Sequence, residues 1–402
     1  MEYITGGVCA PKGFVAGGVN CGIRGKEKRD LALIVSRRMA SAAGVYTQNL
    51  VKGAPVTVTQ AHLADGYARA VIANSGNANT CNPNGISIAE GMCELVETFT
   101  GVKQSDVIVA STGVIGQELD LAPIAYGMPA LMLSLGNHSS DAAEAIMTTD
   151  TAKKELAATF TVGGRPAKIG AIAKGSGMIC PNMATMLVFI TTDAKITPAM
   201  LQKALSACVR DSFNMISVDR DTSTNDMCVA LANGLAENDE IVAEGQNYED
   251  FKAALMELCT GLAKSIAKDG EGATKLLECQ VTGGKTDVDA RKIAKSVICS
   301  NLLKCAMFGA DANWGRVLCA IGYAGAETDV SKIAVSFQSA TGEVKVCQNG
   351  GALPFSEENA KKVLSEDEII IHVALADGDA AATAYGCDLS YDYVKINGDY
   401  RN

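Results

Sequence analysis

Histidine is scarce in this chain, which has three histidines in 402 residues, at His62, His138 and His372. His372 lies in an apolar run typical of a β-strand, where a partly buried structural role is the common one. His62 and His138 stand in polar surroundings typical of a helix end or a loop. None of the three stands in a glycine-rich or strand-end motif, so a Ser-His-Asp triad is a poor fit to this sequence.

Basic residues are also in deficit, because 35 Lys and Arg stand against 45 Asp and Glu, which gives a formal net charge of −10. A surface for nucleic acid or for an anionic membrane needs clustered Lys and Arg, so the composition argues against both kinds of partner. No stretch approaches the roughly 20 apolar residues that span a bilayer. The first residues show no basic segment followed by an apolar one, so we expect a soluble, cytoplasmic protein whose ligands are small molecules.

The 14 cysteines include no Cys-x-x-Cys pair. Scattered single cysteines lack the spacing of a zinc site, so we expect no metal ion. They also differ from the disulfide framework of a small secreted domain, which favours reduced thiols in a cytosol. Cys180 has no histidine or basic partner near it in the sequence, and Pro181 follows it, so we interpret Cys180 as a packing residue rather than a nucleophile.

The rest of the composition is that of a compact globular protein, with 48% hydrophobic residues, 20% charged residues and a mean hydropathy of +0.13. A chain of this length can form two or three domains with a large core. Strands are predicted at 31–36, 70–73, 107–110, 167–172, 186–191 and 333–337, and helices at 86–99, 123–135, 198–212, 248–268 and 288–303. Their irregular order predicts an α/β (α+β) fold in which mixed β-sheets pack between helices. We place a domain boundary near 281–285, where a glycine turn precedes a new amphipathic segment.

The segment 174–187 reads KGSGMICPNMATML and places Thr185 directly after the small Ala184. A threonine can break the peptide bond before it only if its Oγ reaches the preceding carbonyl carbon. Ala184 leaves that carbonyl open, and the glycines and Pro181 permit a bent backbone. Cleavage makes Thr185 a new N-terminus, whose α-amine has an unperturbed pKa of about 8 and can act as the base for its own hydroxyl. The segment therefore predicts an N-terminal threonine nucleophile, which needs no histidine.

Other segments are candidates for the rest of a site. In 107–116 a strand-like run leads into Thr112 and Gly113, a composition typical of an oxyanion hole and also of an ordinary strand-to-helix connection. The Asn-rich segment 74–79 can bind a ligand or satisfy its own backbone. Glu271 stands between two glycines in a turn that we expect to be exposed, where it can hold a substrate ammonium or stay solvated. Lys174 can hold a substrate carboxylate or be a surface lysine.

Taken together, these segments resemble one family, the ornithine acetyltransferases of arginine biosynthesis, also called glutamate N-acetyltransferases. The resemblance covers nearly the whole chain, and the full set in this order is far more specific than any one segment. It is carried by NSGNAN at 74–79, STGVIG at 111–116, MTTDT at 147–151, KGSGM at 174–178, PNMATML at 181–187, DTSTND at 221–226, DGEGATK at 269–275, NWGR at 313–316 and DYVKINGDYRN at 392–402.

The resemblance implies a precursor that cuts itself between Ala184 and Thr185 into an α chain of residues 1–184 and a β chain of residues 185–402, which assemble as α2β2. It also implies a fold similar to that of self-processing aminopeptidases. By the family's pattern, Thr185 is the nucleophile, and Thr112 with Gly113 forms the oxyanion hole. The implied substrate contacts are Thr148 or the adjacent Thr149, Lys174, Thr185, Glu271, Asn397 and Asn402. Family members commonly end in Thr or Ser where this chain has Asn402, and commonly carry Ala where it has Gly398.

The implied activity moves the acetyl group of N2-acetylornithine to glutamate through an ester on Thr185, with no metal or tightly bound cofactor. Acetyl-CoA stays open as a second acetyl donor, because the same threonine chemistry serves both donors. Two alternatives remain. In a self-processing aminopeptidase or amidase, water relieves the acyl-enzyme, whereas a non-catalytic amino-acid-binding protein never cleaves itself. The intact Ala184-Thr185 pair argues against the second alternative.

Overall fold

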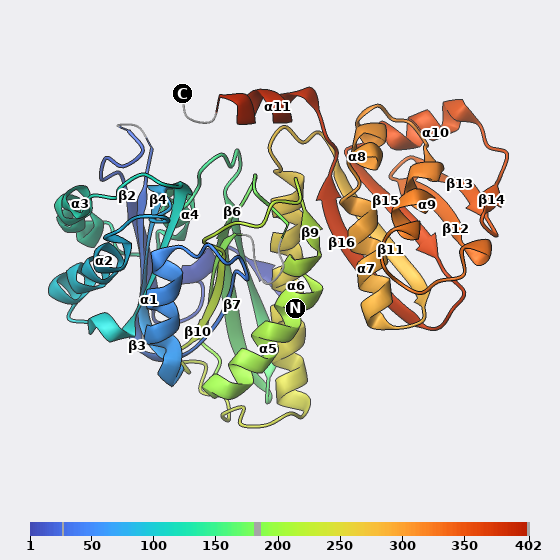
Figure 1. Cartoon of the computed structure of the whole chain (residues 1–402). Coiled ribbons are helices and arrows are strands. Elements are labelled where there is room, and N and C mark those ends of the chain that lie inside the picture. Colours follow the sequence, from blue (N-terminus) through green and yellow to red (C-terminus); the bar gives the residue numbers. More distant parts are fainter. Residues whose placement is uncertain (26–27, 181–185, 400–402) are drawn as a thin grey trace. The chain divides into compact units, whose positions relative to one another are not determined.

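The computed structural model describes residues 1–25, 28–180 and 186–399, and the chain divides into two compact units (Figure 1). Unit 1 comprises Met1–Gly175, Pro181–Phe213 and Thr222–Leu262, and unit 2 comprises Ser176–Cys180, Asn214–Asp221 and Ala263–Asn402. The predicted cleavage pair, Ala184 and Thr185, and the terminal Asn402 lie outside the described residues. The division into α and β chains at that pair therefore stays a prediction.

Among the described residues, nine strands of unit 1 form one mixed sheet in the order β1-β6-β7-β8-β10-β3-β4-β5, with β2 paired to β3. The strands are β1 (Glu2–Ile4), β2 (Phe14–Val19), β3 (Leu31–Tyr46), β4 (Tyr67–Asn77), β5 (Val107–Val114), β6 (Lys154–Val162), β7 (Arg165–Lys174), β8 (Leu187–Thr192) and β10 (Met227–Ala232). Pairing is parallel between β4 and β5 and between β8 and β10, whereas β7 is antiparallel to both of its neighbours. The predicted mixed sheet is confirmed.

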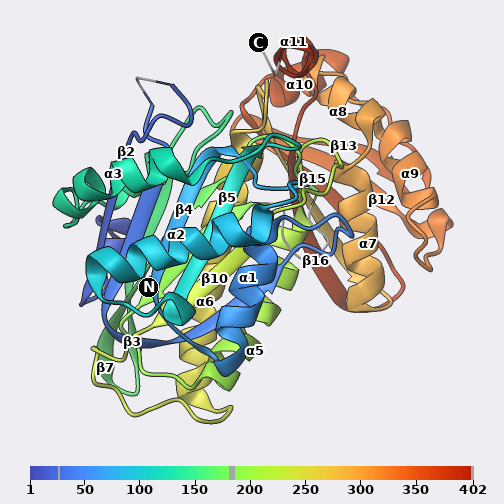
Figure 2. The ribbon, with the colours of Figure 1, turned by 60° about the vertical axis from the view of Figure 1, so that its left-hand side comes forward.

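Helices cover both faces of this sheet. Successive side chains along a strand point to opposite faces, so each buried strand supplies apolar side chains to a core on either face. The helices of unit 1 are α1 (Ala54–His62), α2 (Gly85–Thr100), α3 (Leu121–Leu133), α4 (Ser139–Ala145) and α5 (Pro198–Asp211), and α6 (Gln246–Lys268) begins in it. On one face, Ile72 and Val109 share a core with side chains of α2 and α3. On the other, Val71 and Ile108 pack with side chains of α4. Figure 2 shows α1 and α2 lying across β4 and β5.

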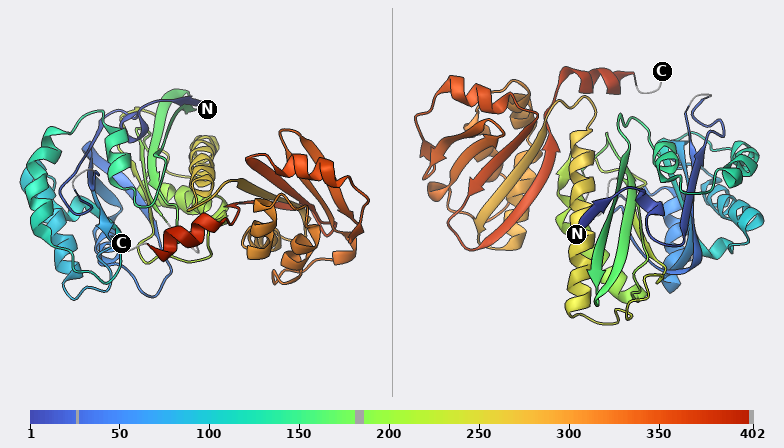
Figure 3. Two further views of the ribbon diagram at one scale, coloured as in Figure 1. Left: turned by 90° about the horizontal axis from the view of Figure 1, so that it is seen from above. Right: turned by 180° about the vertical axis from the view of Figure 1, so that it is seen from behind.

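Unit 2 has a second mixed sheet, of seven strands among its described residues, in the order β14-β13-β12-β15-β11-β16-β9 (Figure 3). The strands are β9 (Ile216–Ser217), β11 (Leu276–Gly284), β12 (Ala334–Ser339), β13 (Gly342–Gln348), β14 (Gly351–Ala352), β15 (Glu368–Ala374) and β16 (Ala380–Cys387). The helices are α7 (Asp287–Ile298), α8 (Asn301–Phe308), α9 (Trp314–Gly322), α10 (Glu357–Leu364) and α11 (Tyr391–Gly398). The core of unit 2 joins Cys279, Phe337 and Ile371 of the sheet to Ile293 of α7 and Val363 of α10.

Short 3₁₀ turns complete the described elements, as η1 (Gly7–Cys9), η2 (Leu63–Asp65), η3 (Gln104–Asp106), η4 (Phe213–Met215) and η5 (Val330–Lys332). The boundary that we predicted near 281–285 falls inside β11, and the division between the units comes earlier, between Leu262 and Ala263. The helix predicted at 288–303 is two helices, because the Ser300 hydroxyl accepts from the backbone N–H of Leu303 and starts α8. No described helix is long and apolar enough to cross a membrane.

Candidate active site

Lys174 is the last residue of β7, where the strand pairs with β8 and Lys174 lies opposite Leu187. Its side chain is not the surface lysine that one interpretation of the sequence allowed, since only 8% of Lys174 is exposed. The Nζ atom donates to Thr112 Oγ1 at 3.4 Å. A buried ammonium needs compensating partners, so the surroundings of Lys174 decide whether it stays charged.

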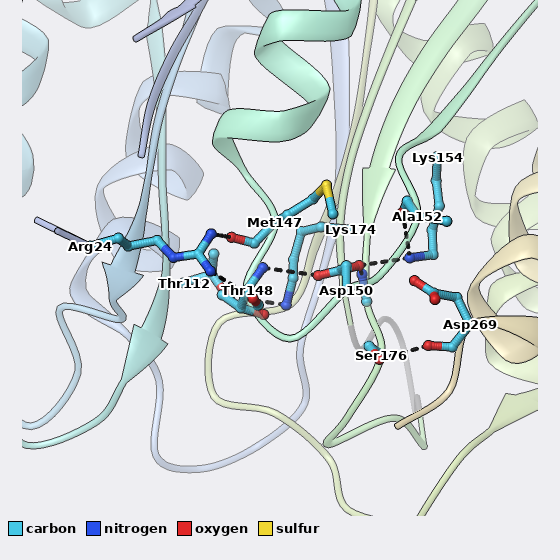
Figure 4. Close-up of polar contacts among 11 residues, drawn as sticks. Arg24, Thr112, Met147, Thr148, Asp150, Ala152, Lys154, Lys174, Ser176 and Asp269 are labelled. Atoms are coloured by element: carbon cyan, nitrogen blue, oxygen red, sulfur yellow. Dashed lines mark hydrogen bonds and ion pairs between the residues drawn. The ribbon is translucent and has the colours of Figure 1, made fainter. Parts of the chain in front are cut away.

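The main anionic neighbour is Asp150, whose carboxylate lies in a buried network with two lysines (Figure 4). Oδ1 of Asp150 accepts from Lys154 Nζ at 2.7 Å and from the backbone N–H of Gly175 at 2.7 Å. Burial by itself raises the pKa of the Asp150 carboxyl, but the Lys174 and Lys154 cations and two hydrogen bonds outweigh it and lower the pKa to about 2. Asp150 is therefore ionised at neutral pH.

Thr112 and Gly113 lie within β5, which extends through the small residues where we expected a turn. Gly113 is paired with Gly76 of β4 and has a φ of +131°, and a Cβ atom there would lie 2.3 Å from the Gly76 carbonyl carbon. Only glycine fits this close approach. Lysine has no acceptor, so Thr112 Oγ1 accepts from Lys174 and keeps its own proton for another acceptor. The structure thus brings Thr112, Gly113 and Lys174 together.

Thr148 and Thr149 are half-buried in the loop between α4 and β6. The backbone N–H of Thr148 donates to Asp150 Oδ2 at 3.0 Å, which attaches this loop to the lysine network. Arg24 holds the same loop, because its guanidinium donates to the carbonyl of Met147 and, at 2.7 Å, to that of Thr148 (Figure 4). The sequence analysis did not single out Arg24, Asp150 or Lys154. A spacing of four residues brings side chains together on a helix, but residues 150–154 lie in a loop and at the start of β6, so no local pattern marks the contact of Asp150 with Lys154.

In unit 2, Glu271 is buried, with 7% of its surface exposed, and this corrects the expectation of an exposed turn. Asn397 of α11 donates from Nδ2 to Glu271 Oε2 at 2.7 Å, and the Glu271 N–H donates to the Ser176 carbonyl at 3.0 Å. A Cβ atom on Gly177 would lie 2.3 Å from the Glu271 carboxylate, so the glycine admits that carboxylate. The predicted pair of Glu271 and Asn397 is in contact.

The segment 176–180 is fixed to unit 2 at several points. Ser176 Oγ donates to the Asp269 carbonyl at 2.6 Å. The backbone N–H groups of Met178 and Ile179 donate to the Asp219 carboxylate at 2.6 and 2.8 Å. Burial raises the pKa of the Asp219 carboxyl, although these N–H donors oppose the rise. The sequence analysis did not identify Asp219, which holds the chain just ahead of the predicted cleavage bond.

Other candidates have structural roles. Asn77 Oδ1 accepts from the N–H of Asn79 at 2.8 Å, and Asn74 Nδ2 donates to the Asn77 carbonyl at 3.0 Å, so the segment 74–79 satisfies its own backbone. His372 lies in β15, as predicted, with Nε2 2.6 Å from Gln338 Oε1. The described residues contain no group of three or more His, Cys, Asp and Glu side chains that could hold a metal ion.

Known proteins show the same sequence pattern. Residues 15–402 match the model of the ArgJ family. The arginine biosynthesis bifunctional protein ArgJ of Caldanaerobacter subterraneus subsp. tengcongensis is 50% identical over 403 residues. The alignment covers 100% of this chain and 100% of that protein. ArgJ of Bacillus subtilis is 47% identical over 99% of this chain and 97% of its own. A crystal structure of ArgJ from Bacillus halodurans is 47% identical with a TM-score of 0.50, over 52% of this chain and 97% of that chain. On its family match and these identities, the chain belongs to the ArgJ family.

Proposed function

We propose that this protein transfers the acetyl group of N2-acetylornithine to glutamate through an acyl-enzyme on Thr185. Membership of the ArgJ family, whose relatives are named for arginine biosynthesis, supports an acetyltransferase in that pathway. The observation that carries the chemistry is the contact of Lys174 with Thr112 beside Gly113. Leu187, two residues after Thr185 in the sequence, pairs with Lys174 in the sheet. This pairing supports a common site for Thr185 and the group of Lys174, Thr112 and Gly113.

In the proposed first half-reaction, the α-amine of Thr185 takes the proton of its own Oγ, and Oγ attacks the acetyl carbonyl carbon. The carbonyl oxygen becomes an oxyanion, and the Thr112 hydroxyl and the Gly113 N–H donate to it. The C–N bond to ornithine then breaks, and the departing amine takes the proton. In the second half-reaction, the amine of glutamate attacks the Thr185 ester by the same steps and leaves as N-acetylglutamate.

The charged side chains divide the recognition of the substrates. Lys174 holds a substrate carboxylate, which is supported by the position of its buried ammonium next to the Thr112 hydroxyl. Glu271 accepts from Asn397 through one oxygen, and a carboxylate has room for further donors, so it holds the side-chain ammonium of acetylornithine. Thr148 or Thr149 and the terminal Asn402 complete the proposed contacts. No metal or tightly bound cofactor is part of this mechanism.

Self-cleavage between Ala184 and Thr185 precedes this chemistry in the proposal, and the two chains assemble as α2β2 in the cytoplasm. One comparison supports cleavage. The curated relatives align along the whole of this chain, whereas nearly all of the Bacillus halodurans crystal chain corresponds to only 52% of it. A processed chain of residues 185–402 has a similar share of the 402 residues.

A second activity, acetylation of glutamate from acetyl-CoA, is favoured by the word bifunctional in the names of the relatives. It uses the same Thr185 ester, so it needs no further catalytic group. An assay that supplies glutamate with each acetyl donor separately, and follows N-acetylglutamate and acetate, distinguishes the activities. Transfer gives N-acetylglutamate, whereas an aminopeptidase or amidase gives acetate and would overturn the proposal.

Denaturing electrophoresis with mass measurement tests the processing step. We expect fragments of 184 and 218 residues from the wild-type chain, and a single inactive chain from Thr185→Ala. Cleavage of Thr185→Ala at the same bond would show that another group breaks it. An uncleaved wild-type chain without transferase activity would favour a non-catalytic binding protein.

A further inference from the structure

Two thiols of unit 2, Cys180 and Cys299, hydrogen-bond to one another at the end of helix α7. Both are half-buried and line a cavity of about 420 Å³ together with Arg220, Lys292, Lys295 and Tyr323. Lys292 and Tyr323 are exposed, so small solutes can reach the cavity from solvent. The proposed transferase mechanism uses neither thiol.

The surroundings of Cys180 favour its thiolate. The hydrogen bond with Cys299 and the Lys295 cation lower the pKa of Cys180, against the opposing effects of burial and of Asp219. The Lys295 ammonium is held in place, because Nζ donates to the carbonyls of Asn214 at 2.7 Å and Ile216 at 2.6 Å. The expectation that Cys180 has no basic neighbour is therefore corrected, because Lys295 approaches it in the folded chain although it is distant in the sequence.

A second observation points to the same place. The Ser217 hydroxyl is completely buried beside the two sulfurs, and a hydrogen bond from it also lowers the pKa of Cys180. A hydroxyl that donates a hydrogen bond to a sulfur stabilises the thiolate form of that thiol.

We propose that Cys180 and Cys299 are an oxidisable pair that hydrogen peroxide converts to a disulfide. The Cys180 thiolate attacks one peroxide oxygen, the O–O bond breaks, and the other oxygen leaves as water after taking a proton. The Cys299 sulfur then attacks the sulfenic sulfur, loses its proton, and releases a second water. Two thiols and one peroxide thus give one disulfide and two waters.

The consequence for the protein depends on the positions of the two cysteines. Cys180 precedes the predicted cleavage bond after Ala184, and Cys299 follows it. If the chain is processed as proposed above, the disulfide joins the end of the α chain covalently to the β chain. This covalent link rests on the proposed function, whereas formation of the disulfide does not.

Peptide mapping tests the pair directly. Trypsin releases Cys180 in a peptide that begins at Gly175, and Cys299 in the peptide 296–304, and each peptide contains a single cysteine. The purified protein is treated with one equivalent of hydrogen peroxide, and free thiols are then alkylated before digestion. We expect the two peptides to be joined in most molecules and separated by a reductant. Absence of the joined pair, with Cys180 alkylated or over-oxidised to sulfinic acid, would overturn the inference.

The same digest separates this inference from the processing step. A joined peptide that ends at Ala184, together with a non-reducing gel band of full-chain mass, supports both. A joined peptide that runs on to Lys195 supports the disulfide and contradicts processing. Cys305→Ser is the matched control, because Cys305 is an exposed thiol on α8 of the same unit and should leave the joined pair unchanged. Cys299→Ser should abolish it.

The role of the Lys295 ammonium is tested by the rate at which Cys180 is alkylated. Below the pKa of a thiol, each unit by which that pKa rises slows its attack about three- to fourfold, since lost thiolate outweighs gained nucleophilicity. Lys295→Met should therefore slow the alkylation of Cys180 at pH 6, because it removes one of the causes that lower the pKa of this thiol. Lys292→Met removes a neighbouring cation of α7 that donates to the Gly325 carbonyl, and it should have less effect. Equal rates in the two variants would remove Lys295 from the inference.

Discussion

Replacement of Asp150 by asparagine tests whether one carboxylate sustains the buried lysine network of unit 1. The Asp150 carboxylate accepts from Lys154, from the Gly175 N–H and from the Thr148 N–H. Asparagine has the same shape, but its amide nitrogen is a donor and must face one of these donors. The substitution also removes the negative charge that balances Lys154 and Lys174.

The pKa of Asp150 sets the size of the effect. A fall from 3.8 to about 2 corresponds to about 2.4 kcal/mol of stabilisation, which is present above the unfolded-state pKa and is lost as pH falls through the folded-state value. Removing one partner of a buried ion pair costs about 3–5 kcal/mol, because the other charge is left without compensation. We therefore expect Asp150→Asn to reduce the free energy of unfolding of unit 1 at pH 7 by about 2–5 kcal/mol.

The assay must report on unit 1. The single tryptophan, Trp314, lies in unit 2, so hydrogen exchange of amides in β6 and β7 is the suitable measurement. These amides should exchange about 30-fold faster or more in the variant at pH 7, since 1.4 kcal/mol is a factor of ten. The difference should shrink near pH 2, where the wild-type carboxyl takes up its proton.

Two controls make the result decisive. Asp211→Asn removes a partly exposed carboxylate paired with Arg210, and it should change the stability by less than about 1 kcal/mol. Asp150→Asn combined with Lys154→Met removes both members of the buried pair, so it should be less destabilising than the sum of the single changes. Additive effects, or exchange in Asp150→Asn equal to that of the control, would refute the reasoning.

Three other predictions concern catalysis. Lys174→Met and Glu271→Gln should each lower kcat/KM for acetylornithine at least about tenfold in protein that still folds, and near-normal kinetics would remove that residue from the site. If the Thr185 amine is the base, activity should fall with decreasing pH in a single step near neutrality, and a pH profile of a variant without the three histidines should keep this step. Gly113→Ala should lose activity as measured by product formation, because its Cβ atom would overlap the Gly76 backbone.

The sequence predicts the elements of the fold well where one periodicity dominates. Short apolar runs rich in β-branched residues identify β4, β5 and β7, and amphipathic periodicity identifies α2 and α5. The ends of elements were less predictable. The small residues at 111–113 were taken for a turn, but they continue β5, because glycine allows β4 and β5 to approach closely at Gly76 and Gly113.

In the candidate site, too, residues were predicted better than their surroundings. Lys174 and Glu271 were singled out from their glycine-rich surroundings, but Glu271 was expected to be exposed and is buried. Its neighbour Gly272 has a φ of +69°, and a Cβ atom there would lie 2.5 Å from the backbone nitrogen of Tyr393. The glycine therefore marks close packing against α11, whereas the sequence pattern alone is shared with exposed turns.

What the sequence could not supply is the set of charged partners. Arg24 contacts Met147 and Thr148 across more than a hundred residues, and Lys295 approaches Cys180 from a helix distant in the sequence. No local pattern encodes such pairs, because each depends on the folded arrangement of its unit. These partners affect the chemistry of the sites. The Lys174 and Lys154 cations lower the pKa of Asp150, and the hydrogen bond with Cys299 together with the Lys295 cation lowers the pKa of Cys180.

The balance of charge around Lys174 connects this packing to function. A single lysine fully neutralised by a buried carboxylate has little electrostatic attraction left for a substrate anion. In unit 1, Asp150 faces two lysines, and Lys154 Nζ and the Gly175 N–H both donate to its Oδ1 at 2.7 Å. The ammonium of Lys174 reaches Thr112 Oγ1 at the proposed oxyanion hole. The Lys154 and Lys174 cations both lower the pKa of Asp150, and in the proposed mechanism a substrate carboxylate binds to Lys174.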